Sequence, residues 1–172
     1  MVVGRFGSAA VAVLGALVST AVSAKDIALT TSGLPVPRYV SLKSDHVNVR
    51  AGPTKDNDVA WVYTRSGLPV EITAEFENWR RVRDSEGAEG WVYHSLLSGR
   101  RTAVVTMKSK DDLAPLHESA DPISVVTARL QAGVVAQVRK CTSNWCHVVG
   151  NGFDGWIEQQ RLWGVYSDEK VD

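Results

Sequence analysis

The strongest constraint on the fold of this chain is an internal repeat. Asn78-Trp79 and Gly90-Trp91 in the first copy match Asn144-Trp145 and Gly155-Trp156 in the second. The offset between the copies is 66 residues at the first Trp and 65 residues at the second. A repeat of this length, in which apolar residues alternate with polar ones, indicates two small β domains in tandem.

Alternation in the first copy predicts its strands. In the segment 68–76, Val70 and Ile72 fall on one face and Glu71 and Thr73 on the other, which is typical of a half-buried strand. Further strands are predicted at 47–50, 59–63, 79–83 and 89–93, turns at 77–78 and 84–87, and a 3₁₀ turn within 93–97.

We therefore expect an all-β protein built from two tandem small barrels of about 65 residues each. The expected domains are residues 37–99 and 100–166, preceded by a flexible linker at 25–36 and followed by a charged tail at 167–172. Because the connection at 99–102 is short, the two repeats are expected to touch.

The first 24 residues resemble a secretory signal peptide. Arg5 precedes an apolar run from Ala9 to Val22, and small residues end at Ala24. The run of about 14 residues is shorter than the roughly 20 residues that span a bilayer as a helix. We expect cleavage after Ala24 and export to the periplasm or beyond, with no membrane span left; an uncleaved anchor is the alternative.

The charge balance argues against a nucleic-acid partner. Without Arg5, the chain holds 18 Lys and Arg residues against 19 Asp and Glu residues. Such a balance gives no basic footprint for nucleic acid or an anionic membrane. The one basic cluster, Arg80 to Arg83, lies near Glu71, Glu75 and Glu89, so we expect a solvated face of mixed charge.

Cys141 and Cys146 are predicted to form a disulfide. If Ser143 and Asn144 make a two-residue hairpin turn, the two cysteines face each other with Cα atoms about 4.5 Å apart. Export would keep such a bond oxidised. Glu75 and Arg80 occupy the equivalent positions of repeat one and are expected to form a cross-strand ion pair.

A metal site is the alternative for the same region. Its ligands would be Cys141, Cys146 and His147, with His117 as the fourth. No second Cys pair exists, and neighbouring residues on a strand point to opposite faces, so we expect no metal. No other cofactor is expected.

No catalytic constellation stands out. The four histidines are scattered, the cysteines are expected to be paired, and the chain has no nucleophile elbow, zinc-protease motif or P-loop. We therefore expect a protein without enzymatic activity.

The opening segment Val47-Asn48-Val49-Arg50-Ala51-Gly52-Pro53 resembles the first strand of bacterial SH3 domains. Gly90-Trp91-Val92 and Gly155-Trp156-Ile157 resemble the closing strand of these domains, and Cys141 to Cys146 is similar to the second repeat of exported tandem members. The resemblance implies small β-barrels that engage peptidoglycan or an envelope protein. The notable departure is in repeat two, where Ala114 and Leu116 are expected to replace Asn48 and Arg50.

Repeat one is therefore the expected binding repeat. Aromatic rings beside a few polar groups suit a peptide or a sugar-linked peptide, and Arg50 suits a carboxylate. The predicted ligand-binding residues are Asn48, Arg50, Trp61, Tyr63, Trp79, Trp91 and Tyr93. Trp79 and Trp91 have counterparts in repeat two, which favours a core position over a binding role for them. Trp61 and Tyr63, aligned with Thr127 and Arg129, have no aromatic counterparts and are the better candidates for a site.

Overall fold

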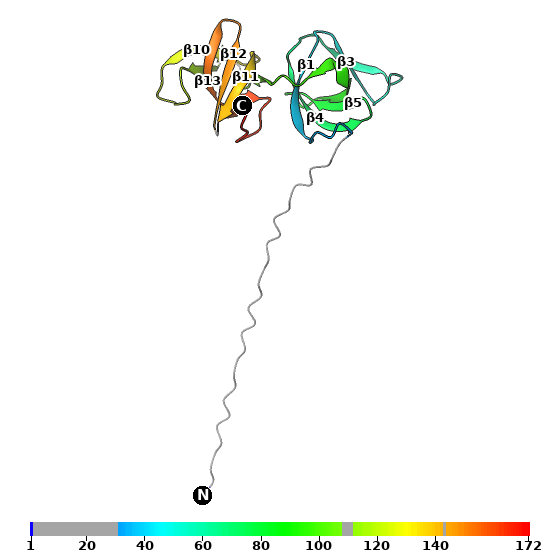
Figure 1. Ribbon diagram of the computed structural model, residues 1–172, viewed down its shortest axis with the longest axis horizontal. Coiled ribbons are helices and arrows are strands. Elements are labelled where there is room, and N and C mark those ends of the chain that lie inside the picture. The colour runs from blue at the N-terminus through cyan, green and yellow to red at the C-terminus, as the bar shows by residue number, and fades with distance from the viewer. Residues whose placement is uncertain (2–30, 108–111, 143) are drawn as a thin grey trace.

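The chain is described by a computed structural model that covers residues 1, 31–107, 112–142 and 144–172. Apart from Met1, the predicted signal peptide lies outside these residues, as does the linker up to residue 30. Figure 1 shows two β units side by side, joined by a short connection. Each unit is one antiparallel seven-stranded sheet, so the prediction of an all-β protein with two tandem barrels is confirmed.

The first sheet has the strand order β3-β2-β6-β5-β4-β1-β7. The strands predicted at 47–50, 59–63, 79–83 and 89–93 have exactly those bounds, and the 3₁₀ turn η1 spans His94–Leu96. Two strands, β1 and the edge strand β7, were not predicted. The seven strands are β1 (Arg38–Leu42), β2 (Val47–Arg50), β3 (Val59–Tyr63), β4 (Pro69–Phe76), β5 (Trp79–Arg83), β6 (Glu89–Tyr93) and β7 (Leu97–Ser98).

The second sheet repeats this plan in the order β10-β9-β13-β12-β11-β8-β14. The expected connection ends one residue early, because Thr102 already belongs to β8. A second 3₁₀ turn, η2, spans Gln159–Arg161. The strands are β8 (Thr102–Val105), β9 (Leu113–His117), β10 (Val126–Gln131), β11 (Val135–Thr142), β12 (Trp145–Gly150), β13 (Phe153–Glu158) and β14 (Leu162–Trp163).

Each sheet curls around its own hydrophobic core. In repeat one, Val47, Val49, Val82 and Val92 are fully buried and belong to one cluster. These residues alternate along β2, β5 and β6 with partly or fully exposed ones, as expected when one face of a strand is buried. No helix among the residues described is long and apolar enough to cross a bilayer.

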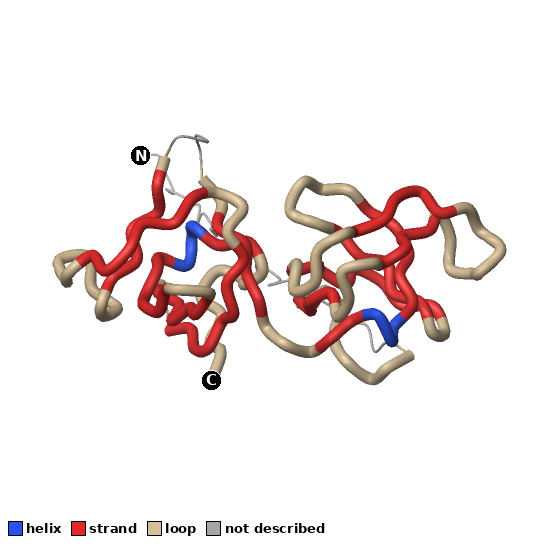
Figure 2. Tube along the Cα trace, turned by 90° about the horizontal axis from the view of Figure 1, so that it is seen from above, coloured by secondary structure: helices blue, strands red, loops and turns tan. Residues whose placement is uncertain are grey.

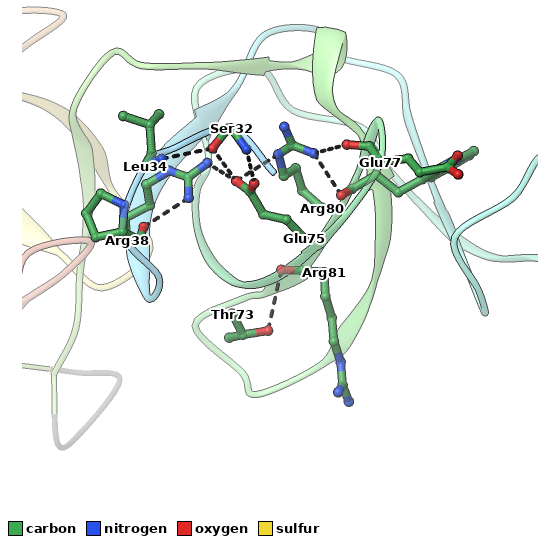
Figure 3. Close-up of polar contacts among 10 residues, drawn as sticks. Ser32, Leu34, Arg38, Thr73, Glu75, Glu77, Arg80 and Arg81 are labelled. Atoms are coloured by element: carbon green, nitrogen blue, oxygen red, sulfur yellow. Dashed lines mark hydrogen bonds and ion pairs between the residues drawn. The ribbon is translucent and has the colours of Figure 1, made fainter. Parts of the chain in front are cut away.

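The β4–β5 hairpin of repeat one is fastened by a buried carboxylate (Figure 3). Glu75 Oε1 accepts bonds from Arg38 at 2.5 Å and from Arg80 at 3.1 Å, and the Glu75 side chain is 0% exposed. Ser32, in the segment before β1, donates its backbone N–H and its hydroxyl to the same carboxylate. The predicted ion pair between Glu75 and Arg80 is confirmed, and a segment N-terminal to the barrel straps it.

The equivalent hairpin of repeat two is fastened by the disulfide. Cys141 and Cys146 face each other across β11 and β12 with Cα atoms 4.1 Å apart, so the predicted bond is confirmed. Val171 in the tail exchanges two backbone hydrogen bonds with Cys141. A segment C-terminal to this barrel therefore straps its hairpin, as the N-terminal segment does in repeat one.

The two repeats touch, as predicted, through aromatic rings (Figure 2 shows the two units from above). The ring of Tyr39 lies 5.0 Å from that of Trp163 and 4.6 Å from that of Tyr166. The Tyr166 hydroxyl donates to Glu71 Oε1 at 2.8 Å. Burial, with a smaller effect of Glu71, raises the pKa of Tyr39 to about 12, so this ring remains neutral in ordinary buffers.

Glu169 makes this junction sensitive to acid. Burial raises the pKa of Glu169, but bonds from Arg101 at 2.7 Å and from the Tyr166 N–H at 2.9 Å outweigh burial and leave it below its ordinary value. A carboxyl group with a lowered folded-state pKa stabilises the fold above its unfolded-state pKa and loses that effect as the pH falls through the folded-state value.

We therefore expect the free energy of unfolding to fall between about pH 5 and pH 3, and we expect Glu169→Gln to flatten part of that fall. Urea titrations at several pH values measure the effect. Glu118→Gln, at an exposed position, serves as the control. Identical pH profiles for wild type and Glu169→Gln would contradict the assignment.

Candidate functional site

Five of the seven predicted binding residues share one face of the repeat-one sheet. Strands β2, β6 and β5 are neighbours, and their register pairs Arg50 with Trp91 and Tyr93 with Trp79. Directly paired residues of an antiparallel sheet lie on the same face. Two-residue spacing adds Asn48 to that face through β2. We call this set, Asn48, Arg50, Trp79, Trp91 and Tyr93, the aromatic face.

The aromatic face lies opposite the core. Neither Trp79 nor Trp91 belongs to the hydrophobic core cluster, although the intervening Val82 and Val92 do. Trp79 is only 8% exposed, and the ring of Tyr93 meets it edge-on at 5.4 Å. Trp91 is half-buried. Trp79 is thus buried, in agreement with the core alternative, whereas Trp91 is half-buried and lies outside the core cluster.

Ion pairs surround the aromatic rings. Arg81, directly opposite Trp91 on β5, binds Glu89 at 2.6 Å, and Arg83 binds Glu71. With the Arg80 pair, each arginine of the basic cluster has a carboxylate partner, so the predicted mixing of charges is confirmed. The side chains of Arg81 and Arg83 are solvated as predicted. The Arg80–Glu75 pair is instead buried on the other side of the strand. Arg81 was not among the predicted site residues; its two-residue spacing from Trp79 was the signal that placed it on this face.

Arg50 has a structural contact as well as an exposed part. One of its terminal nitrogens donates to the backbone carbonyl of Asn57 at 2.6 Å. The Asn57 side chain in turn accepts bonds from the N–H and the hydroxyl of Thr54. Arg50 therefore holds the loop between β2 and β3, and its guanidinium has five N–H donors, of which this contact uses one.

The other two predicted residues, Trp61 and Tyr63, lie on the opposite face of the sheet. They pair with the buried Val49 and Val47 and pack against the core cluster from the end strand β3. The Tyr63 hydroxyl donates to Asp84 Oδ2 at 2.9 Å, and burial, followed by this bond, raises the pKa of Tyr63. A pocket of about 220 Å³ beside Tyr63 is closed by Val104 of repeat two. The seven residues therefore form two separate regions.

Repeat two carries the counterpart of the aromatic face. His117 pairs with Trp156 as Arg50 pairs with Trp91, and the His147 ring stacks on Trp156 at 5.2 Å. His147 also binds Asp154 at 2.5 Å, in the positions of the Arg81–Glu89 pair. His117 Nδ1 donates to the carbonyl of Ser124 at 3.1 Å, much as Arg50 holds its own loop. Imidazoles thus replace both guanidinium groups.

This register corrects the alignment of the two opening segments. Ala114 and Leu116 are 0% exposed and take the places of the buried Val47 and Val49, not those of Asn48 and Arg50. The counterpart of Arg50 is His117, and the offset here is 67 residues. By the same register, Trp61 and Tyr63 match Ala128 and Leu130 rather than Thr127 and Arg129, so they still have no aromatic counterparts.

Cys141 and Cys146 form a disulfide with each other, so they provide no thiolate ligands for the alternative metal site. His117 and His147 lie on the face opposite the buried Cys146. Across 31–107, 112–142 and 144–172, no group of three or more His, Cys, Asp or Glu side chains is arranged to hold a metal ion.

Comparison with solved structures finds weak similarity to larger proteins. NlpC2 of Trichomonas vaginalis shares 13% identity at a TM-score of 0.33, with 74% of this chain and 48% of that chain covered. NlpC1 of the same organism shares 13% identity at a TM-score of 0.32, with 81% of this chain and 50% of that chain covered. An NlpC/P60 family protein of Bacillus cereus ATCC 10987 shares 11% identity at a TM-score of 0.29, with 78% of this chain and 58% of that chain covered. The chain thus spans about half the length of these proteins.

No curated protein matches the chain. The family model described as bacterial SH3 domain matches residues 43–99 and again residues 110–164. These two segments contain most of both sheets and both aromatic faces. The chain therefore belongs to the bacterial SH3 domain family, of which it carries two tandem copies.

Proposed function

We propose that this protein is a non-catalytic, exported binding module that holds cell-wall peptidoglycan, or the peptides of peptidoglycan, on the aromatic face of repeat one. The observation that carries the proposal is the convergence of Asn48, Arg50, Trp91 and Tyr93 on one solvent-facing side of two adjacent strands, β2 and β6. Membership of the bacterial SH3 family and the disulfide support a role at the cell wall outside the cytoplasm.

The chemistry of the face suits a peptide that bears carboxylates. The free N–H groups of Arg50 can meet a carboxylate with two parallel hydrogen bonds. Trp91, paired directly with Arg50, offers a flat ring for an extended backbone or a sugar. Asn48, two residues before Arg50, adds an amide that both donates and accepts.

A matched pair of variants tests this function. We expect the chain from Lys25 to Asp172 to co-sediment with purified peptidoglycan sacculi, and we expect Trp91→Ala to weaken retention about tenfold or more, since central aromatic anchors carry most binding energy. Trp156→Ala removes the equivalent ring of repeat two and should bind far better than Trp91→Ala. Circular dichroism checks that both variants are folded.

Loss of retention in both variants to the same extent would remove the assignment to repeat one. No sedimentation of the wild type at high wall concentration would overturn the wall-binding function itself. Release of soluble fragments from the sacculi would contradict the non-catalytic role.

Binding to an envelope protein is the second candidate function, and one patch favours it. Ile123, Val125 and Val126 of repeat two are 90%, 66% and 37% exposed. Adjacent exposed apolar side chains of this size are typical of surfaces that contact another protein. This alternative would be established if the chain did not sediment with sacculi but formed a stable complex with an envelope protein, and if the double variant Ile123→Ser/Val125→Ser no longer formed that complex.

A further inference from the structure

A pocket lies in repeat two, away from the aromatic face of repeat one. It has a volume of about 630 Å³ and opens beside the start of β12, the 3₁₀ turn η2 and the tail. Its polar and aromatic lining includes Asn144, Trp145, Glu158, Gln160, Ser167 and Asp168. We call it the tail pocket.

A single exchange between the repeats leaves room for this pocket. In repeat one, Trp79 is paired with Tyr93, whose ring meets the indole at 5.4 Å. In repeat two, the pair is Trp145 and Glu158. Both of the latter line the tail pocket, so the carboxylate stands where the first repeat has an aromatic ring.

The walls of the tail pocket are held in place. Gln159 is 6% exposed, and its side-chain nitrogen donates to the carbonyls of Tyr166 and Glu169, while its oxygen accepts from the Asp168 N–H. The ring of His117 meets Trp145 edge-on at 5.2 Å. When the walls of a pocket are fixed before binding, few side chains lose conformational entropy as the ligand binds.

The chemistry of the lining selects a neutral ligand rich in hydroxyl groups. The lining contains no Lys or Arg, which disfavours an anion. Glu158 is already bound by Arg161 at 2.6 Å, so its charge is balanced, and Asp168 is exposed to screening water. Amides, carboxylates and a hydroxyl offer planar acceptors and donors around one indole, which suits the hydroxyls and the apolar face of a sugar.

We propose that the tail pocket of repeat two is a second binding site, which takes a neutral saccharide unit against Trp145. The site is independent of the proposed function, since it shares no residue with the aromatic face of repeat one. It gives repeat two a ligand of its own.

Titration with two soluble probes, an N-acetylglucosamine tetramer and cellotetraose, tests the site. The chain is labelled with 5-fluorotryptophan, so that each indole has its own ¹⁹F resonance. We expect at least one probe to shift the Trp145 resonance saturably, with a dissociation constant on the order of 1 mM. The Trp91 resonance reports separately on the aromatic face of repeat one.

Two variants provide the control. Glu158→Tyr recreates the pairing found in repeat one and should weaken saccharide binding about tenfold or more without unfolding the domain. Glu118→Gln, at an exposed position of repeat two outside the tail pocket, should leave saccharide binding within about twofold. If Glu158→Tyr fails to fold, Gln160→Ala at the exposed rim replaces it and should weaken binding several-fold.

The saccharide assignment would be overturned if the pocket bound the cation n-butylammonium but neither sugar, and if Asp168→Asn abolished the binding of that cation. No shift of Trp145 with either sugar at 20-fold the expected dissociation constant would also overturn it. Sedimentation with sacculi that depends on Trp91 would be unaffected by either result, so the two proposals fail separately.

Discussion

Replacing Glu75 with Gln is expected to lower the free energy of unfolding by about 3 kcal/mol, because removing one partner from a buried ion pair leaves the other charge buried and unpaired. Arg38 and Arg80, with side chains 17% and 10% exposed, both bind this carboxylate. The amide of Gln keeps the size of the side chain but removes its charge. Urea unfolding followed by tryptophan fluorescence measures the loss.

The Arg81–Glu89 pair, which joins β5 to the next strand β6, offers a matched control. Its side chains are 49% and 30% exposed, so Glu89→Gln should cost less than about 1 kcal/mol. Equal losses for Glu75→Gln and Glu89→Gln would show that the buried carboxylate does not fasten the hairpin as described.

Removing the disulfide with Cys141→Ala/Cys146→Ala should lower the free energy of unfolding by about 2 kcal/mol, the chain-entropy value for a closed loop of about six residues. Alanine adds no polar group to positions that are 2% and 0% exposed. Urea titration of the oxidised wild type and the variant gives the difference.

Reducing agent supplies the internal control for this second prediction. Dithiothreitol should bring the wild type down to the stability of the variant and leave the variant unchanged. A variant that is as stable as the oxidised wild type, or one that dithiothreitol destabilises further, would contradict the prediction.

Most of the strands that the sequence pattern located have a strict alternation, whereas β3 is apolar throughout. β5 and β6 were predicted to the residue, because Val82 and Val92 alternate with polar or aromatic neighbours between two clear turns. β1 and β8 were missed. β8, with all four residues buried, has no alternation to detect, and the two-residue strands β7 and β14 are too short to carry a period.

The predicted site was divided by a feature that spacing could not reveal. Trp61 and Tyr63 share a two-residue spacing with each other, but only the pairing of β3 with β2 shows that they face the core side. The segment from Leu130 to Gly133, at the end of β10, is one residue shorter than the segment from Tyr63 to Gly67, and this difference shifted the alignment of the preceding strands by one residue. The tail pocket depends on contacts of Gln159 with residues up to ten positions away, which no motif records.

The two terminal straps impose an order on how the molecule matures. Repeat one draws its strap from Ser32 and its last strand from Ser98, so it can close before any of repeat two has emerged during synthesis or export. Repeat two needs Val171 to cover the edge at Cys141. Once it has closed, both sulfur-bearing residues are almost fully buried, and an oxidant needs access to a thiol. Oxidation of the two thiols therefore has to take place while repeat two is still open.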